Sequence, residues 1–446
     1  MTKCVLIVAY EFYPFNTGGS HRPFRLACFL KKEGYEPVVV TADDADLEPT
    51  RDPSLNSCLE HERIEVIRIP SRRRGGLSRL SDTYYFNITD DAWGRWKRQA
   101  MLRLDELLAT RNVLCSIVTV PPFSLVDLMP FLKRANIPVI LDLRDAWSQW
   151  NVSPYATKLH YKLTLKKERK ALADADQILV TSHVTLEDLR RLHGESLGTK
   201  LMLVPNSFDE LKLATALPSG DEIHIGYVGS FYYDPDRDRL NRSGWWKKKP
   251  WQWFQYLPHR EEWIYRSPYF VFSAFDALFR RFPEYRKKVQ LHIAGSKPLW
   301  FDEMVARFSL QSVVQHHGFL NKQEVEEMQN RMHYMLITSS KRHGARDYSI
   351  AGKTYDFLAN LKPMLAFVTD GAQRDVLSGT GIAHIFDPDD IDSSIELLKR
   401  VIDKEVRLTP DMEYINQYRS ANVFRPLIQE LRKWEAASVR DAQVSK

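Results

Sequence analysis

The sequence predicts an α/β protein built from two Rossmann-like domains in tandem. Short runs rich in Val, Ile and Leu alternate with helical periodicity from the start of the chain, which is typical of buried parallel strands and their connecting helices. The same pattern starts again near the middle of the chain, at IHIGYVGSF. In addition, a chain of 446 residues is too long for one hydrophobic core.

In the first half, VLIVAY is the first predicted strand, and a helix follows it through Leu30. The next predicted strands are EPVVVT, IEVIRI, CSIVTV, PVILDL and QILVTS. A repeated strand–helix–strand order predicts a doubly wound sheet with right-handed crossovers. We therefore expect a first domain over residues 1–210.

In the second half, IHIGYVGSF is followed by VQLHIAGS, VVQHHGF, HYMLITSS, PMLAFVT and IAHIF, which predict a second sheet of the same kind. This domain is expected over residues 211–415. A helical segment over 416–446 is expected to cross back to the first domain. Two such domains are expected to face one another across a cleft, at the carboxyl ends of both sheets.

Composition and charge narrow the class of protein. The chain is 44% hydrophobic and 27% charged, as globular proteins are, and no apolar run approaches the ~20 residues of a membrane span. The net charge of +6 is concentrated at residues 72–74 and 245–249, which fits anionic ligands or lipids as well as a solvated face. No nucleic-acid-binding module is recognisable, so nucleic acid is not an expected partner. Four cysteines without metal spacing predict reduced thiols in a cytoplasmic protein.

The first candidate site is the segment NTGGSHRPF after the first strand. Gly18 and Gly19 allow backbone N–H groups to approach a ligand closely. Ser20 is a candidate N-cap and Pro23 lies in the first turn of the next helix, whose positive end would face the ligand. These features favour a phosphate group. A glycine turn that only reverses the chain is the alternative.

The second candidate site is the segment SIAGKTYDF in the second domain. Residues 349–353 are expected to open a helix, where amide groups and Lys353 suit a diphosphate. Asp356, about one turn further on, could accept hydrogen bonds from ribose hydroxyls. A surface ion pair between Lys353 and Asp356 is the alternative.

The ordered set of segments resembles the GT-B glycosyltransferases, most closely the retaining enzymes of glycosyltransferase family 4. It covers nearly the whole chain apart from a tryptophan-rich segment. The matching segments are YEFYPFNTGGSHRPFRLACFLKKEGYEPVVVT, VILDLRDAWS, ADQILVTS, LVPNSFD, IGYVGSF, IAGSKP, HHGFL and IAGKTYDFLANLKPMLAF. The resemblance implies a GT-B fold and an enzyme that moves a sugar, with retention, from a nucleotide diphosphate to a hydroxyl of a glycan or glycolipid acceptor. Polysaccharide or surface-glycan biosynthesis is the implied setting.

The resemblance also implies which residues bind the donor. Gly18 and Gly19 resemble the loop that contacts the diphosphate and the transferred sugar. Gly352 and Lys353 resemble the loop that contacts the donor phosphates from the other side. Asp356 stands where the family usually has the second glutamate of its E-x7-E pair, which binds the ribose.

Three further donor contacts follow from the same resemblance. Arg266 resembles a basic residue, often a lysine, that neutralises the diphosphate. Gly318 and Phe319 belong to a loop that resembles the one framing the nucleobase. Ser349 is also expected to bind the donor, because it stands at the expected start of the helix that carries Lys353.

The chain also departs from the family's pattern. Eight residues before Asp356 stands Tyr348, not an acid, and Asp347 lies one position further away. The first glutamate of the pair is therefore missing or displaced. Gly229 and Ser230 stand where the family often has Gly-Arg, so that Arg266, Lys353 or Arg346 must cover the phosphates.

The predicted catalytic residues are Asp145, Arg144 and His21. Arg144 falls near a position where many relatives carry histidine, in a region that lines the sugar pocket, and His21 lies at the start of the first helix. A local ion pair between Arg144 and Asp145 is the alternative. The resemblance implies front-side attack in which the leaving diphosphate takes the acceptor's proton, so that the protein mainly stabilises charge. No cofactor and no metal are then required, and the D-x-D strings at Asp234 and Asp387 are interpreted as turn acids.

The segment over 232–266 interrupts the second domain and holds five of the eleven tryptophans. Three interpretations remain open: a packed structural subdomain, a platform for sugar rings, or peripheral contact with a membrane through the Trp/Lys-rich stretch 245–266. The last would place the protein at the inner face of a membrane. For the whole chain, the alternatives to a transferase are a nucleotide-sugar epimerase or hydrolase of the same fold, and an inactive binding protein.

Overall fold

A computed structural model describes residues 3–44, 47–71, 95–149, 154–212, 220–236 and 253–444. They form two compact units. The first comprises Met1–Asp209, Pro250–Pro258 and Tyr418–Lys446, and the second Glu210–Lys249 and His259–Gln417. The tryptophan-rich stretch, which we assigned to the second domain from the sequence, is thus divided between the units, and Trp245, Trp246 and Trp251 lie outside the described residues.

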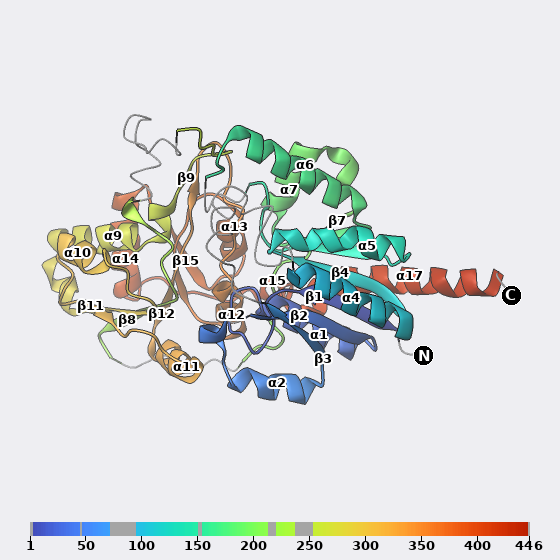
Figure 1. Cartoon of the computed structure of the whole chain (residues 1–446). Helices are drawn as coiled ribbons and strands as arrows, with labels where there is room; N and C mark the ends of the chain where they lie inside the picture. Colours follow the sequence, from blue (N-terminus) through green and yellow to red (C-terminus); the bar gives the residue numbers. More distant parts are fainter. Residues whose placement is uncertain are drawn as a thin grey trace. The chain divides into compact units, whose positions relative to one another are not determined.

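The first unit is built on a seven-stranded parallel sheet in the order β3-β2-β1-β4-β5-β6-β7 (Figure 1). Its strands are β1 (Cys4–Ala9), β2 (Glu36–Asp44), β3 (Glu65–Ser71), β4 (Val113–Val120), β5 (Val139–Leu143), β6 (Gln177–Val180) and β7 (Leu201–Leu203). Its helices are α1 (His21–Lys32), α2 (Ser54–Glu62), α4 (Arg95–Thr110), α5 (Met129–Arg134), α6 (Lys158–Asp174), α7 (His183–His193), α16 (Ser420–Val423) and α17 (Arg425–Val444). All six residues of β1 are buried, so this strand runs through the middle of the core.

The alternating residues of β1 separate two layers of core. Leu6 and Val8 face a cluster with α4, α5, α6 and α7, whereas Val5 and Ile7 face one with α1, α2, α16 and α17. This is the doubly wound arrangement that the sequence predicts. The predicted return of the C-terminal helix is confirmed, because Leu427 and its neighbours in α17 pack in the second of these clusters.

The second unit has a six-stranded parallel sheet in the order β11-β10-β8-β12-β14-β15. Its strands are β8 (Ile223–Val228), β10 (Val289–Ala294), β11 (Val314–His316), β12 (Tyr334–Thr338), β14 (Met364–Phe367) and β15 (Ala383–Phe386), with the short antiparallel pair β9 (Glu261–Glu262) and β13 (Lys341–Arg342) beside them. Its helices are α9 (Tyr269–Arg281), α10 (Phe301–Arg307), α11 (Lys322–Arg331), α12 (Lys353–Ala359), α13 (Ala372–Ser378), α14 (Ile391–Ile402) and α15 (Met412–Asn416). The first strand of each unit, β1 or β8, lies third in its sheet, with the later strands on both sides. Both units therefore have the Rossmann-like order.

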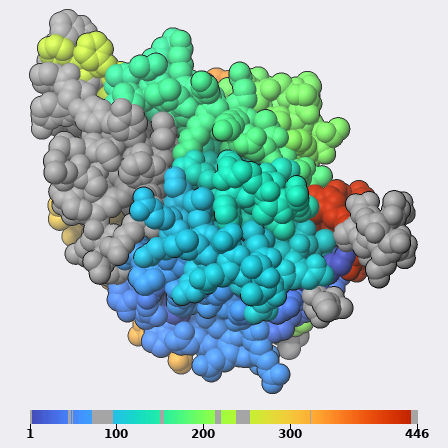
Figure 2. Space-filling view, turned by 45° about the vertical axis from the view of Figure 1, so that its right-hand side comes forward, coloured from blue at the N-terminus to red at the C-terminus, as the bar shows by residue number. Residues whose placement is uncertain are grey.

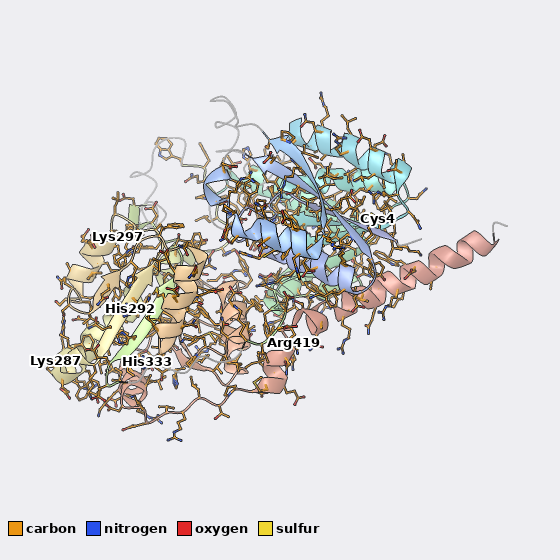
Figure 3. All side chains as sticks on the ribbon, turned by 90° about the horizontal axis from the view of Figure 1, so that it is seen from below. Cys4, Lys287, His292, Lys297, His333 and Arg419 are labelled. Atoms are coloured by element: carbon orange, nitrogen blue, oxygen red, sulfur yellow. The ribbon has the colours of Figure 1, made fainter. Side chains whose placement is uncertain are left out.

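A row of histidines crosses the second sheet. His224 Nδ1 lies 3.0 Å from His292 Nε2, and His292 Nδ1 lies 3.0 Å from His317 Nε2. Figure 3 labels His292 on β10 and His333, which stacks on His224 with ring centroids 5.8 Å apart. Burial, and then the charges of His224, His317 and Arg331, lower the pKa of His292 from 6.5 to about 4.

This row should make the second unit sensitive to acid. His292 stays neutral in the folded protein down to about pH 4, whereas in the unfolded chain it gains a proton near pH 6.5. The unfolded state therefore binds more protons in this window, and stability must fall as the pH drops through it. We expect the urea midpoint to decrease between pH 7 and pH 4.5, and His292→Gln to reduce that decrease. An equal decrease in both proteins would contradict the role of His292.

Candidate functional site

The loops that follow β8, β10 and β11 are joined at the carboxyl end of the second sheet. Gly229 N donates to Ala294 O at 2.9 Å, and Gly295 N donates to Gly318 O at 2.8 Å. A Cβ on Gly295, whose φ is +136°, would lie 2.2 Å from Gly229 O. Only glycine permits this approach at position 295. The carboxyl ends of parallel strands are where such sheets bind ligands.

Lys353 places its ammonium group at this end of the sheet. Its Nζ donates to Val228 O at 3.1 Å and lies 3.6 Å from the ring centroid of Tyr227. Burial, and then the charge of Arg266, lower the pKa of Lys353 to about 7. The ammonium group is therefore directed to the end of β8. Neither of these two contacts, the Val228 carbonyl and the Tyr227 ring, carries a negative charge. An anion bound next to the ammonium group would hold Lys353 in its charged form.

Arg266 supplies a second cation. It donates a hydrogen bond to Ser349 Oγ, and its guanidinium carbon lies 4.9 Å from the ring centroid of Trp263. Burial alone would lower the pKa of Arg266, but the charges of Asp347 and Glu261 raise it above the usual value. Arg266 is thus fixed in its charged form next to the loop that precedes Lys353.

Asp347 lies one residue from the position where the family has its first glutamate. Its Oδ1 accepts from Ser349 N at 3.1 Å and from Ser349 Oγ at 2.9 Å. The side chain is buried, and burial raises its pKa although Arg266 opposes that effect. Asp347 therefore orients Ser349 and balances the charge of Arg266.

Glu261 is a buried acid that sequence reasoning did not single out. It lies in β9, at the end of the tryptophan-rich segment, with its Oε2 3.9 Å from His259 Nε2. Burial alone would raise the pKa of Glu261, but His259, Arg266 and Ser340 hold it below the usual value. No local pattern marks an acid in that segment; in the structure β9 pairs with β13, with Glu261 opposite Arg342.

The loop predicted to frame a nucleobase lies beside the glycine contacts. Gly318 has φ +73° and accepts the hydrogen bond from Gly295, while its own N–H donates to His316 Nδ1 at 3.1 Å. Phe319 is exposed. A bare aromatic ring next to polar backbone suits a planar ring system such as a base.

The predicted helix start at Ser349 is wrong by four residues. Helix α12 begins at Lys353, and Ser349 is held in the preceding loop by Asp347. Gly352 is at the N-cap position and exposed, and Asp356, in the first turn, is also exposed. The residues of this segment still gather at one end of the sheet, with Lys353 near Gly229 and Ser349 bonded to Arg266.

The glycine loop of the first unit is also tightly fitted. A Cβ on Gly19 would lie 2.4 Å from both Arg144 Nη1 and Glu11 Oε2, whereas one on Gly18 would meet nothing within 4 Å. Ser20 does not cap α1 with its side chain, contrary to the sequence prediction. Its hydroxyl donates to Thr17 O at 2.9 Å, because the loop folds back on itself before the helix begins.

The remaining predicted residues of the first unit lie at the carboxyl end of its sheet. His21 Nδ1 lies 2.8 Å from Tyr13 Oη. Arg144 follows β5; its N–H donates to Val120 O at 3.0 Å and its carbonyl accepts from Thr181 Oγ1 at 3.0 Å. Asp145 is exposed. Arg144 also leaves no room for a side chain at position 19, which the sequence did not predict.

The D-x-D strings are turn acids, as interpreted from the sequence. Asp234 Oδ1 accepts from Asp236 N at 3.0 Å, and Asp387 Oδ1 accepts from Asp389 N at 3.0 Å. Asp389 also forms an ion pair with Lys341 at 2.5 Å. Across the described part of the chain, no three His, Cys, Asp or Glu side chains are grouped to hold a metal ion.

Comparisons with solved structures agree with this architecture. The lipopolysaccharide outer core galactosyltransferase WaaB is 14% identical, with a TM-score of 0.55, over 97% of this chain and 99% of the other. Sucrose-phosphate synthase from Thermosynechococcus elongatus is 14% identical, with a TM-score of 0.57, over 99% and 98%. The putative UDP-N-acetylglucosamine 2-epimerase from Listeria monocytogenes is 12% identical, with a TM-score of 0.54, over 98% of each chain. The fold is therefore GT-B, with two Rossmann-like domains.

The sequence comparison is more specific for the first unit. Residues 17–207 match the family model of the glycosyl transferase 4-like domain. A search of curated proteins finds no match. This domain and the GT-B fold together support a glycosyltransferase. In the described ranges, none of the helices is both long and apolar enough to cross a membrane.

Proposed function

We propose that the protein is a retaining glycosyltransferase that takes a sugar from a nucleotide diphosphate and transfers it to a hydroxyl group of a glycan or lipid-linked acceptor. The main support is the position of Lys353, with its ammonium group at the carboxyl end of the second sheet, next to Gly229 and near Arg266. Two cations and a glycine-rich backbone edge suit a diphosphate.

In this proposal the second unit binds the donor. Lys353 and Arg266 neutralise the diphosphate as negative charge builds on it, which is the main catalytic contribution of the protein. Phe319 and Gly318 contact the base, and Asp356 the ribose. Gly18 and Gly19 of the first unit remain the predicted contacts for the diphosphate and the transferred sugar, and His21, Arg144 and Asp145 remain the predicted catalytic residues. No metal or other cofactor is required, since the two side chains supply the positive charge.

A thermal unfolding experiment tests the donor site. We expect one of UDP, GDP, ADP, CDP and dTDP, at millimolar concentration, to stabilise the protein, by about 2.7 kcal/mol at a hundredfold excess over its dissociation constant. Arg266→Gln should reduce the stabilisation. The control is Lys287→Met, at the opposite end of β10 from Lys297, as Figure 3 shows. No stabilisation by any nucleotide would contradict the proposal.

Acceptor dependence then separates the transferase from its rivals. A transferase should release nucleotide from its donor mainly when an acceptor is added. An epimerase or hydrolase would turn over the donor alone, and an inactive binding protein would release none. We place the acceptor in polysaccharide or surface-glycan biosynthesis and the protein in the cytoplasm, at the inner face of a membrane.

A further inference from the structure

Helix α6 of the first unit has an unusual outer face. Leu159 is 63% exposed and Leu163 is 43% exposed, one turn apart. Lys162 and Lys166 are exposed beside them, at the spacing of one helical face. The inner face of α6 packs in the core through Ala171 and Leu172. The two leucines are therefore not needed for the core of the unit. Helix α6 lies in the green region at the top of Figure 2.

The exposed face of α6 is strongly cationic. Helix α6 carries five lysines and one arginine, of which Lys167 is paired with Asp127 at 3.0 Å, and only two carboxylates, Glu168 and Asp174. Glu168 is buried and lies 2.8 Å from His193 Nε2, and Asp174 is the last residue of the helix. The carboxylates of α6 therefore do not offset the charge that surrounds Leu159 and Leu163.

A second segment adds aromatic rings next to this helix. Tyr256 exchanges two backbone hydrogen bonds of 2.9 Å with Tyr155, just before α6, and its ring lies 5.0 Å from that of Tyr161. This pairing holds Trp253 and Phe254 near the start of α6. They are 47% and 71% exposed. Exposed leucines, aromatic rings and lysines thus lie together on the first unit.

We propose that this surface docks on an anionic lipid bilayer. The α6 patch consists of Leu159, Leu163, Trp253 and Phe254, with Lys158, Lys162 and Lys166 around them. Apolar side chains would enter the headgroup region while the lysines reach the anionic headgroups, as in interfacial amphipathic helices. Lysine is depleted in protein–protein interfaces, which favours lipid over a protein partner. The proposal rests on the proposed function, which places the protein at the inner face of a membrane, and deepens it by naming the surface that docks there.

Vesicle flotation with the full chain tests this proposal. We expect binding to vesicles of phosphatidylcholine with phosphatidylglycerol, weaker binding at high salt, and little binding to phosphatidylcholine alone. Leu159→Ser with Leu163→Ser should lower the partition coefficient by about tenfold or more. Lys162→Gln with Lys166→Gln should lower it by about fivefold for each lysine.

The matched control is Leu102→Ser, on α4 of the same unit, where the leucine is 62% exposed and is not a member of the α6 patch. It should bind vesicles like the unaltered chain. Equal binding by the double leucine variant would overturn the proposal, and so would failure of the unaltered chain to float with anionic vesicles. A dimer that the double leucine variant dissociates, in analytical ultracentrifugation, would assign the patch to a second copy instead. Nucleotide-induced stabilisation, measured on the same samples, reports separately on the donor site.

Discussion

Replacing Lys353 with methionine is expected to weaken the binding of a nucleoside diphosphate by about 30-fold or more. Truncating one partner of a charged hydrogen-bonded pair at a buried contact costs about 2–5 kcal/mol, since the other charge is left unpaired. The Nζ of Lys353 lies 3.6 Å from the ring centroid of Tyr227. Methionine fills most of the space that the lysine stem occupies above this ring. The loss should therefore come from the charge and not from a cavity.

The same lysine predicts a pH dependence of binding. Without a ligand, Lys353 has a pKa of about 7, below its value of 10.5 in the unfolded chain, so folding stability should rise with pH between these values. A bound diphosphate holds the ammonium group charged, so binding above pH 7 takes up a proton. The dissociation constant should then increase with pH, by up to about tenfold per unit.

Isothermal titration calorimetry between about pH 6.5 and about pH 8.5 measures both effects, because the heat in buffers of different ionisation enthalpy reports the proton uptake. The methionine variant should show a weak and nearly pH-independent affinity. Lys287→Met should behave like the unaltered protein. A Lys353→Met variant that binds as tightly as the unaltered protein, with the same proton uptake, would contradict the assignment.

The fold could be predicted because its strands are buried on both faces. VLIVAY, PVILDL and VQLHIAGS are found as β1, β5 and β10; every residue of β1 and β5 is buried, and so are four of the six residues of β10. The restart at IHIGYVGSF is found as β8, the first strand of a second sheet with the same strand order. Local composition carries this information, since no residue far along the chain is needed to recognise a buried strand.

The candidate site was only partly predictable. Lys353, Arg266 and Ser349 were identified, and the last two are hydrogen-bonded although 83 positions separate them. Glu261 was missed because an antiparallel pair of two residues, Lys341↔Glu262 and Arg342↔Glu261, brings it into place. The grouping of residues 250–258 with the first unit likewise depends on the pairing of Tyr155 with Tyr256. Contacts between residues so far apart along the chain leave no periodic pattern in the sequence.

Replacing Asp142 with alanine is expected to destabilise the first unit by about 3–5 kcal/mol, the usual cost of leaving a buried charge unpaired. Asp142 is fully buried and its Oδ1 accepts from Arg22 Nε at 3.0 Å and Nη2 at 2.8 Å. Thr119 Oγ1 donates to the second carboxylate oxygen at 3.2 Å. Alanine at position 142 would leave the buried guanidinium group of Arg22 without its counter-charge.

A double replacement distinguishes the contribution of the Arg22–Asp142 charges from that of the volume that the two side chains fill. Arg22→Met with Asp142→Leu removes both charges, and it should recover most of the stability lost in Asp142→Ala, because buried ion pairs and apolar groups of similar volume often differ little. The exposed pair Arg103–Glu106, at 2.6 Å, provides the control. Glu106→Ala should cost less than about 1 kcal/mol. Urea unfolding measures the stability of all three variants: Asp142→Ala, the double replacement and Glu106→Ala.

The buried pair of Arg22 and Asp142 also affects the glycine loop. Arg22 also donates to Pro205 O at 2.9 Å, so it ties the start of α1 to the end of the sheet, three residues after Gly19. If the double replacement restores stability without restoring nucleotide-dependent activity, Arg22 positions the loop as well as stabilising the fold. If Asp142→Ala costs no more than Glu106→Ala, the guanidinium group must reach water or another anion in the variant. Burial of the charge would then not explain why an arginine stands at position 22.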